Sequence, residues 1–234
     1  MPEAYIVSAV RTAGGRKGGR LAGIHPVDLA AISLNAVVER AGVDPAAVED
    51  VIMGCVTQAG EQSLHVGRNA VLASKLPQSV PAVTIDRQCG SSQQAIQFAA
   101  QAVMSGTQDV VIAAGVESMT RAPMGLSMVA DKGFNPFPPS VTDKYGVPFF
   151  SQFMGAEMIA KKYGYDRETL DEYALRSHQR AKAATEAGAF EAEIVPVEVT
   201  LPDGSKEIQR STKASASTRR SKGSARSSCS RRMA

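Results

Sequence analysis

Cysteine, histidine and long apolar runs are all scarce in this sequence. The 234 residues include three cysteines and three histidines, and no two cysteines form a Cys-x-x-Cys pair. Such scattered cysteines argue against a disulfide framework and against a zinc site. No run approaches the ~20 apolar residues of a membrane span, and the first residues lack the basic-then-apolar pattern of a signal peptide. We therefore expect a cytoplasmic protein with no membrane partner and no bound metal.

Acidic residues are missing from the last part of the chain. All 23 Asp and Glu lie within residues 1–210, whereas seven of the 26 Lys and Arg lie within residues 211–234. The first segment therefore carries a net charge of −4 and the second a net charge of +7. The second segment also has eight serines and almost no aliphatic residues, so it cannot form a core and is expected to be disordered. A nucleic-acid-binding arm is one interpretation of this composition.

Strand-like and helix-like segments alternate over the first 116 residues. Glycines in the basic stretch 14–19 do not form a G-x-x-x-x-G-K-[ST] motif, so this stretch is interpreted as a flexible basic loop. Apolar patterns predict strands at residues 4–10, 51–56, about 83–85 and 109–116, and helices at residues 27–41, 66–74 and between Cys89 and Gly106. This alternation is typical of a layered α/β sandwich.

The composition changes after residue 116. Residues 117–148 are rich in Met, Pro, Gly and Phe, which predicts an irregular excursion from the sheet. Two helices are expected next, at residues 153–163 and 167–187, with Asp166 as the N-cap of the second. A strand at residues 193–200 and a turn at residues 202–204 complete the pattern.

The segment around Cys89 carries the strongest indication of chemistry. Cys89 follows an apolar run and precedes three small residues, after which the helix begins. Unpaired N–H groups and the positive end of the helix dipole favour a thiolate at that place, and a thiolate can attack a carbonyl carbon. The local pattern alone leaves a second interpretation open, in which Cys89 is a small buried hydrophobic residue.

Five other candidate groups are interpreted as structural. Cys55 lies within a strand-like run, and Glu117 follows a strand, where local hydrogen bonding is expected. His25 and His65 precede helices, and His178 lies on a charged helix face. Capping or solvated roles are therefore expected for these histidines.

Six segments resemble, in order between Ala4 and Arg210, the thiolase family of acyl-CoA C-acyltransferases. They read YIVSAVRTAGGRKGG, DVIMGCVTQAGEQ, RQCGSSQQAI, AGVESMTRAP, MGAEMIAKKYG and RETLDEYALRSHQRAKAA. The resemblance implies a thiolase-like layered α/β sandwich. Residues 1–119 would form the N-terminal domain, and residues 120–210 would form part of the loop domain that covers the active site. Cys89 matches the acyl-accepting cysteine, so the resemblance implies that it is the catalytic nucleophile.

The resemblance also implies a reaction. Acyl-CoA and coenzyme A would be the substrates, with no permanently bound cofactor, in either thiolysis of a 3-ketoacyl-CoA or Claisen condensation with acetyl-CoA. A full-length chain would form a homodimer or homotetramer. Ala13, Ser92 and Phe153 stand where Pro, Gly and His are usual. The bulky, apolar Phe153 argues against a simple acetoacetyl-CoA specificity.

Three motifs of the family do not occur in these 234 residues. They are Asn-Glu-Ala-Phe, Gly-His-Pro and Cys-x-Gly, which in the family supply the histidine base, the second cysteine and the oxyanion donors. Back-translation of residues 212–234, read one base earlier, can spell a sequence that resembles the continuation of the loop domain. We therefore expect a frameshift near codon 211 and an inactive, truncated chain, so nucleic acid is not an expected partner.

Two alternative functions are left open. One is a non-catalytic interaction protein whose basic tail binds nucleic acid. The other is a cysteine hydrolase, which would transfer an acyl group from a thioester to water and would not depend on coenzyme A as the acceptor.

Overall fold

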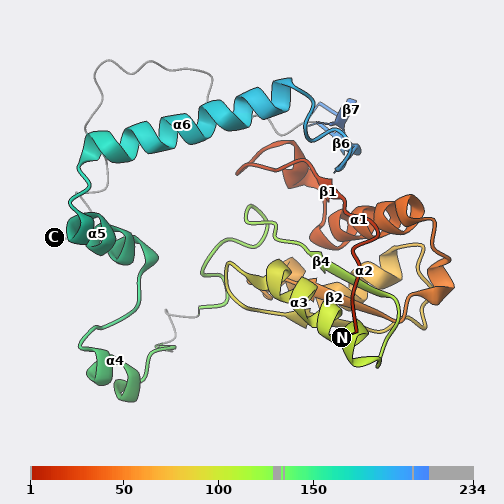
Figure 1. Cartoon of the computed structure of the whole chain (residues 1–234), viewed down its shortest axis with the longest axis horizontal. Coiled ribbons are helices and arrows are strands. Elements are labelled where there is room, and N and C mark those ends of the chain that lie inside the picture. The colour runs from red at the N-terminus through yellow and green to blue at the C-terminus, as the bar shows by residue number, and fades with distance from the viewer. Residues whose placement is uncertain (1, 129–132, 134, 202, 211–234) are drawn as a thin grey trace.

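A three-stranded parallel sheet lies at the centre of the structure, a computed structural model that describes residues 2–128, 133, 135–201 and 203–210. The strands lie in the order β3-β2-β4, with bounds β2 (Asp50–Gly54), β3 (Ala82–Ile85) and β4 (Val111–Gly115). Figure 1 labels β2 and β4 of this sheet. In this register Gly54 at the end of β2 pairs with Ile85 on one side and with Gly115 on the other. The carboxyl ends of all three strands therefore meet at one edge of the sheet.

Helices cover both faces of this sheet: α1 (Pro26–Ala41), α2 (Val66–Ala73) and α3 (Ser91–Ser105). Because alternate residues of a strand face opposite sides, Val51 and Met53 of β2 pack with buried residues of α1 and α2. Ile52, between them, packs on the other side with Ala95 and Ala99 of α3. The predicted α/β sandwich is confirmed, with its layers in the order α1 and α2, sheet, α3.

The capping residues of α1 and α3 explain where these predicted helices begin and end. His25 is the N-cap of α1 and Pro26 its first residue, and Gly42 ends the helix with φ 65°. Gly106 ends α3 with φ 72°. Glycine reaches this left-handed conformation without the steric cost that a side chain would add, so these positions could be predicted from local sequence.

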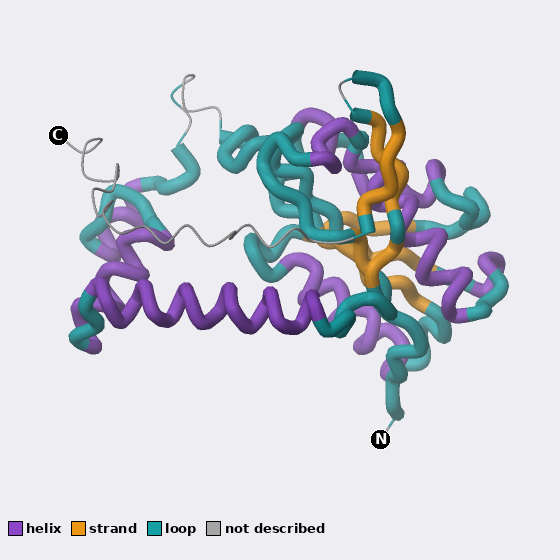
Figure 2. The backbone as a smooth tube through the Cα atoms, turned by 90° about the horizontal axis from the view of Figure 1, so that it is seen from above, coloured by secondary structure: helices purple, strands orange, loops and turns teal. Residues whose placement is uncertain are grey.

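The second part of the chain extends away from this sandwich. It contains α4 (Pro139–Tyr145), α5 (Gln152–Tyr163) and α6 (Arg167–Glu186). Figure 2 shows α6 running from the side of α4 and α5 back to the strands. Asp166 is the N-cap of α6, as predicted, because its carboxylate accepts the Thr169 N–H at 2.8 Å. Within the described residues, no helix combines the length and the apolar character that crossing a membrane requires.

Two small pairings return the chain to the sandwich. They are the parallel pair β1 (Arg11–Thr12) with β5 (Ile194–Val195), and the antiparallel pair β6 (Val197–Thr200) with β7 (Lys206–Gln209). The remaining elements are short 3-10 turns: η1 (Arg20–Gly23), η2 (Pro45–Ala47) and η3 (Gly60–Gln62).

The prediction of a first strand at residues 4–10 is wrong. Only Arg11 and Thr12 pair, whereas Tyr5, Ile6 and Val7 are each more than three-quarters exposed. Residues 4–10 instead line an apolar groove of about 460 Å³ that β4, α1 and α3 also line. An apolar run predicts an extended backbone, but a strand also needs a neighbour at hydrogen-bonding distance, and none lies there among the described residues.

Two further expectations for the second part need correction, and one strand there was not expected. The excursion at residues 117–148 is not wholly irregular, because it contains α4. The strand expected at residues 193–200 is split into β5 and β6 by Pro196, which has no N–H to donate to a ladder. β7 was not predicted at all. The proposed boundary between residues 119 and 120 stays a prediction, and the disordered tail expected at residues 211–234 lies outside the described residues.

Candidate active site

The candidate residues gather at the carboxyl edge of the parallel sheet. Cys55 follows β2 directly, the turn with Cys89 follows β3, and Glu117 lies two residues after β4. In open α/β sheets ligands bind outside the carboxyl ends of the strands. The sheet therefore brings the three segments that were singled out in the sequence to the place where such folds build sites.

Cys89 occupies a sharp turn between β3 and α3. Gly90 is the N-cap of α3 and Ser91 its first residue, so Cys89 lies directly before the N-cap. The thiol is free and exposed, which excludes the interpretation of Cys89 as a buried hydrophobic residue. The predicted arrangement of strand, turn, cysteine and helix is confirmed, whereas the role of Cys89 as nucleophile stays a prediction.

The backbone before Cys89 is held in a left-handed conformation. Gln88 has φ 40° and is one of the few non-glycine residues with a positive φ in the described chain. Its N–H donates to Asp86 Oδ1 at 2.6 Å, and its carbonyl oxygen accepts the Ser91 hydroxyl at 2.7 Å. Side chains on both sides of Gln88 therefore fix this residue.

Two glycines allow α3 to lie directly on the sheet edge. A Cβ at Gly54 would lie 2.5 Å from the backbone carbon of Ser91, and a Cβ at Gly115 would lie 1.8 Å from Ser92 Oγ. No side chain fits at Gly54 while α3 stays where it is, and none fits at Gly115 beside the present Ser92 side chain. Sequence reasoning missed both glycines, because they end apolar runs and look like ordinary strand terminators.

Cys55 is placed quite differently from Cys89. Its side chain is fully buried, and the loss of solvation raises the pKa of its thiol to about 12, with the carboxylates of Glu117 and Asp86 as smaller causes. At neutral pH such a thiol is protonated and inaccessible. This agrees with the structural role predicted for Cys55.

Glu117 joins the loops that follow β2 and β4. Its carboxylate accepts the N–H of Val56 at 2.7 Å, the N–H of Thr57 at 3.2 Å and an N–H of the Gln62 side chain at 3.0 Å. Gln62 is completely buried and accepts the Ser118 N–H at 2.6 Å. The hydrogen-bonding role expected for Glu117 is confirmed, but no sequence signal identified Gln62 as its partner.

The histidines serve helix termini, as predicted, or face solvent. His25 Nδ1 accepts the Val27 N–H at 3.2 Å, and His65 Nδ1 accepts the Arg68 N–H at 2.9 Å. His178 is exposed on α6. Among the residues that the structure describes, no three His, Cys, Asp or Glu side chains are grouped so that they could hold a metal ion.

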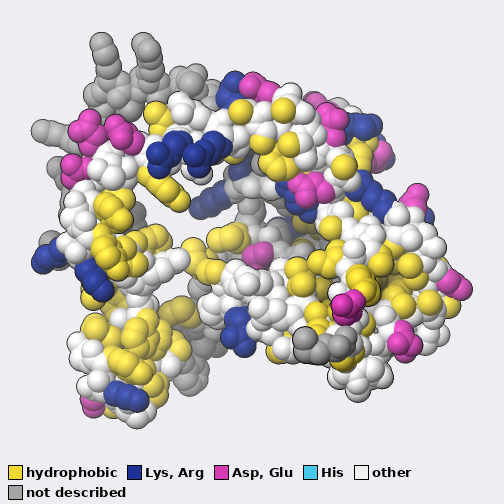
Figure 3. Space-filling view, viewed as in Figure 1, with side chains coloured by type: hydrophobic (Ala, Val, Ile, Leu, Met, Phe, Trp, Pro, Cys, Tyr) yellow, Lys and Arg dark blue, Asp and Glu magenta, His cyan; other side chains and the backbone are white. Residues whose placement is uncertain are grey.

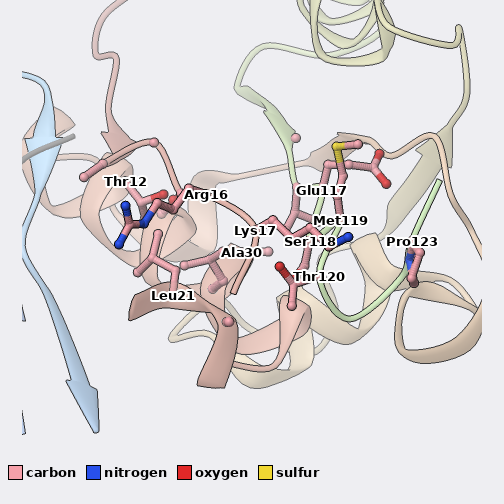
Figure 4. A pocket seen from close by; sticks show the side chains of 18 of the residues that line it. Thr12, Arg16, Lys17, Leu21, Ala30, Glu117, Ser118, Met119, Thr120 and Pro123 are labelled. Carbon is pink, nitrogen blue, oxygen red and sulfur yellow. The ribbon is translucent and has the colours of Figure 1, made fainter. Parts of the chain in front are cut away.

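A cavity of about 690 Å³ lies between the basic glycine-rich loop and the segment after β4 (Figure 4). Thr12 and Arg16 lie on one side, and Glu117, Ser118 and Met119 lie on the other. The Gly18 N–H donates to Thr120 Oγ1 at 3.1 Å, which links the two sides.

The cavity and the exposed thiol are neighbours but separate features. Gly115 lines the cavity and also contacts Ser92 of α3, whereas Cys89 is not among the lining residues. The described residues therefore place an exposed thiol and a cavity at one sheet edge without bringing them together.

Comparisons with known proteins agree with this arrangement. Residues 4–222 match the family model for the thiolase N-terminal domain. A steroid 3-ketoacyl-CoA thiolase of Mycobacterium tuberculosis is 50% identical over 203 residues, which cover 85% of this chain and 50% of that protein. A 3-ketoacyl-CoA thiolase of Bacillus subtilis is 42% identical over 206 residues, with coverages of 87% and 51%. A β-ketoadipyl-CoA thiolase of Acinetobacter baylyi is 44% identical over 215 residues, with coverages of 86% and 53%.

The chain spans about half the length of the curated relatives it matches. The frameshift expected near codon 211 concerns residues outside the described part, so it stays a prediction. The family model, in contrast, matches most of the chain, and its match includes β2, β3, β4 and the turn that carries Cys89. The chain therefore belongs to the thiolase family and contains the N-terminal domain of that family.

Proposed function

We propose that the chain is part of a thiolase-type acyl-CoA C-acyltransferase in which Cys89 accepts the acyl group. The observation that carries this proposal is the exposed Cys89 thiol directly before α3, at the carboxyl edge of the sheet, in a member of this family. The names of the relatives support 3-ketoacyl-CoA thioesters as the substrate class.

The chemistry proposed for Cys89 has two steps. In condensation the Sγ thiolate first attacks the thioester carbonyl carbon of an acyl-CoA, the carbon–sulfur bond to coenzyme A breaks, and coenzyme A leaves as the thiolate. In thiolysis it first attacks the 3-keto carbon of a 3-ketoacyl-CoA, the bond between C2 and C3 breaks, and acetyl-CoA leaves as the carbanion, which takes up a proton. The acyl group then passes from Cys89 to a second acceptor, which is coenzyme A in thiolysis or the carbanion of acetyl-CoA in condensation. Coenzyme A and acyl-CoA are thus substrates, and no permanently bound cofactor takes part.

The 234 residues supply only part of this machinery. None of the motifs Asn-Glu-Ala-Phe, Gly-His-Pro and Cys-x-Gly occurs in the sequence, and the described histidines His25 and His65 are engaged as helix caps. We expect the chain alone to be several orders of magnitude slower than a thiolase that carries these groups, because catalytic groups act as a unit. A cytoplasmic location, homo-oligomer formation and the division into residues 1–119 and 120–210 belong to the same proposal.

The first half-reaction tests the role of Cys89. The chain is incubated with acetyl-CoA at about pH 9, where hydroxide can deprotonate a thiol without a catalytic base. The masses of the tryptic peptides are then measured by mass spectrometry. We expect an acetyl adduct on the peptide Gln88–Arg121, which contains Cys89. Cys89→Ala should abolish this adduct, and the matched variant Cys55→Ala should keep it. A chain that acquires no adduct on this peptide, while free glutathione is acetylated in the same solution, would contradict the proposal.

The same sample separates a transferase from a cysteine hydrolase. Added coenzyme A should remove the acetyl group from Cys89 much faster than buffer alone does. Equal loss with and without coenzyme A would favour the hydrolase. The nucleic-acid-binding alternative depends on residues 211–234, and no observation in the described part of the chain favours it.

A further inference from the structure

We propose that Asp86 and Ser91 are positioning residues for Cys89. They act by holding Gln88, the residue before the cysteine, in a backbone conformation that it would not adopt alone. This inference rests on the proposed function only in naming Cys89 as the reacting group, and its test does not require acyl transfer.

The conformation of Gln88 is the starting point. Its φ of 40° lies in the left-handed region, where the Cβ of an L-residue meets the neighbouring carbonyl oxygen. Glycine avoids this cost, and Asn and Asp tolerate it, but Gln is not favoured there. Such strain persists only where the surroundings fix the residue, and it is typical of functional turns.

Asp86 fixes Gln88 from the N-terminal side. One carboxylate oxygen of Asp86 accepts the backbone N–H of Gln88 at 2.6 Å, and the other accepts the side-chain N–H of Gln88 at 2.9 Å. Both oxygens of one carboxylate are thus directed at a single residue. A charged acceptor makes these hydrogen bonds stronger than neutral ones.

Ser91 fixes Gln88 from the C-terminal side. Its hydroxyl donates to the Gln88 carbonyl oxygen at 2.7 Å and accepts the Arg87 N–H at 3.1 Å. The backbone N–H of Ser91 also points to the Gln88 carbonyl, at 3.2 Å. Ser91 is only 5% exposed, so these hydrogen bonds are protected from competing water.

The sheet supports this arrangement from behind. Gly54 lies so close to α3 that a Cβ would meet the backbone of Ser91 at 2.5 Å and that of Ser92 at 2.5 Å. The first turn of α3 therefore cannot move toward the sheet, and Asp86 extends from the end of β3. The turn is fixed at both ends, which leaves Cys89 exposed in one orientation before the N-terminus of α3.

The consequence for Cys89 is electrostatic. The N–H groups and the dipole of α3 stabilise a thiolate only while the sulfur stays near the helix axis. If Gln88 relaxes to a common backbone conformation, the direction of the chain at Cys89 changes and the thiol is no longer held beside the N-terminus of α3. Asp86 and Ser91 would then control reactivity without touching the substrate.

Alkylation of Cys89 measures this effect in the full chain. Iodoacetamide reacts with the thiolate, forming a carbon–sulfur bond with loss of iodide, and the rate is followed from pH 5 to pH 10 on the peptide Gln88–Arg121. We expect Asp86→Ala and Ser91→Ala to slow alkylation at pH 7 by roughly fivefold to tenfold.

The sign of this effect distinguishes positioning from simple charge. Removal of a carboxylate from the neighbourhood of a thiol by itself favours the thiolate and would speed alkylation. A slower reaction in Asp86→Ala therefore indicates that the orientation of the Cys89 thiol has been lost. Asp86→Asn keeps an acceptor for the Gln88 N–H and should retain more of the parent rate than Asp86→Ala.

Glycine at position 88 provides a rescue experiment. Glycine adopts a positive φ without strain, so Gln88→Gly combined with Asp86→Ala should recover most of the parent rate. Asp44→Ala is the matched control, because the Asp44 carboxylate accepts the Ala46 N–H at 2.9 Å in an equivalent local turn at η2. This control should leave the alkylation profile unchanged.

Cys55 reports whether each variant stays folded. Its buried thiol, on the peptide Ala41–Arg68, should remain unlabelled in every variant that keeps the fold. Parent-like profiles in Asp86→Ala and Ser91→Ala, with Cys55 protected, would overturn the inference, as would a slow Asp86→Ala variant that Gln88→Gly fails to rescue. If Cys55 becomes labelled in the alanine variants, the alkylation profile of the milder variant Asp86→Asn is compared with that of the parent instead. A parent-like profile in Asp86→Asn, with Cys55 protected, would then overturn the inference.

Failure of the proposed function gives a different result. In that case the parent chain acquires no acetyl adduct from acetyl-CoA, yet the alkylation profiles of parent and variants still differ. The two proposals can therefore fail independently.

Discussion

At the scale of single residues, similar side chains at one sheet edge have different environments. Cys55 and Cys89 both follow parallel strands, but Cys55 is buried and Cys89 is exposed before α3. The loop after β2, which begins at Cys55, is held by the buried amide of Gln62 together with Glu117.

Gln62 gives a prediction at this scale. Gln62→Leu keeps the approximate volume but leaves the Thr57 carbonyl and the Ser118 N–H without their partner, so the free energy of unfolding should fall by about 1–3 kcal/mol. Gln93→Leu is the matched control, because Gln93 is exposed and its change should stay within about 0.5 kcal/mol. Urea unfolding measures both variants, and equal effects would contradict the importance of the buried amide.

At the scale of elements, α3 is placed by the two glycines that it touches. Gly54 faces the backbone of α3, whereas Gly115 faces the side chain of Ser92. A backbone cannot rotate out of the way, but a side chain can be removed. The two contacts should therefore respond differently to the same substitution.

Alanine at these glycines tests the difference. We expect Gly54→Ala and Gly115→Ala each to destabilise the protein by about 1–3 kcal/mol through overpacking. Ser92→Gly should restore most of the loss in the Gly115→Ala chain, because it removes the atoms that the new Cβ meets, and should restore none of the loss in the Gly54→Ala chain. Denaturant unfolding of the four variants measures this, and equal rescue in both backgrounds would show that the contacts are not as described.

The start of α6 gives a pH-dependent prediction. The Thr169 backbone N–H holds the pKa of the Asp166 carboxyl below its usual 3.8. A lowered folded pKa means that the charged cap contributes stability above the unfolded pKa and that this contribution is lost as the pH falls through the folded pKa. The thermal midpoint of the parent should therefore exceed that of Asp166→Asn at pH 6, and the difference should shrink below about pH 4. A difference that does not change with pH would contradict the role of the charge.

Sequence patterns predicted the elements whose signals are local. The ends of α1 and α3, the cap at Asp166 and the turn with Cys89 all depend on residues within a few positions of one another. The failures concern pairing over long distances. Residues 4–10 have the composition of a strand, but whether they pair depends on what lies beside them in space. The contacts of Gly54 and Gln62 were missed for the same reason, because their partners lie far along the chain.

At the scale of the whole molecule, apolar side chains remain exposed on the extended second part. Figure 3 shows them gathered over α4 and α5, and large exposed residues there include Phe149, Phe150, Phe153, Met154 and Met158. Contiguous exposed apolar surface is unusual for a monomer and marks regions that associate. The segment with α4 and α5 therefore presents apolar surface of the kind that folded proteins normally cover.

This exposure predicts the behaviour of the chain in solution. Phe153 is 73% exposed, so Phe153→Gln should change the free energy of unfolding by no more than about 0.5 kcal/mol while it reduces binding of an apolar fluorescent dye. Light scattering after size-exclusion chromatography should show less association at high concentration. Leu34→Gln is the contrasting variant, since Leu34 is fully buried and its change should unfold the chain. A large loss of stability in Phe153→Gln would show that this residue is packed in solution.

The short pairing between β1 and β5 has a consequence for how fast the native state can form. Arg11 and Glu193, whose side chains meet at 2.9 Å beside this pairing, are separated by 182 positions in the sequence. Arg40 near the end of α1 also donates to the carbonyl oxygens of Ala192 and Ile194, so further hydrogen bonds hold this late segment against the first part of the chain. Closing so long a segment costs chain entropy before any contact repays it, whereas the sheet of β2, β3 and β4 assembles from residues 50–115. Refolding should thus be biphasic. The sandwich should form in the fast phase, and the docking of residues 192–195 against it should limit the rate of the slow phase.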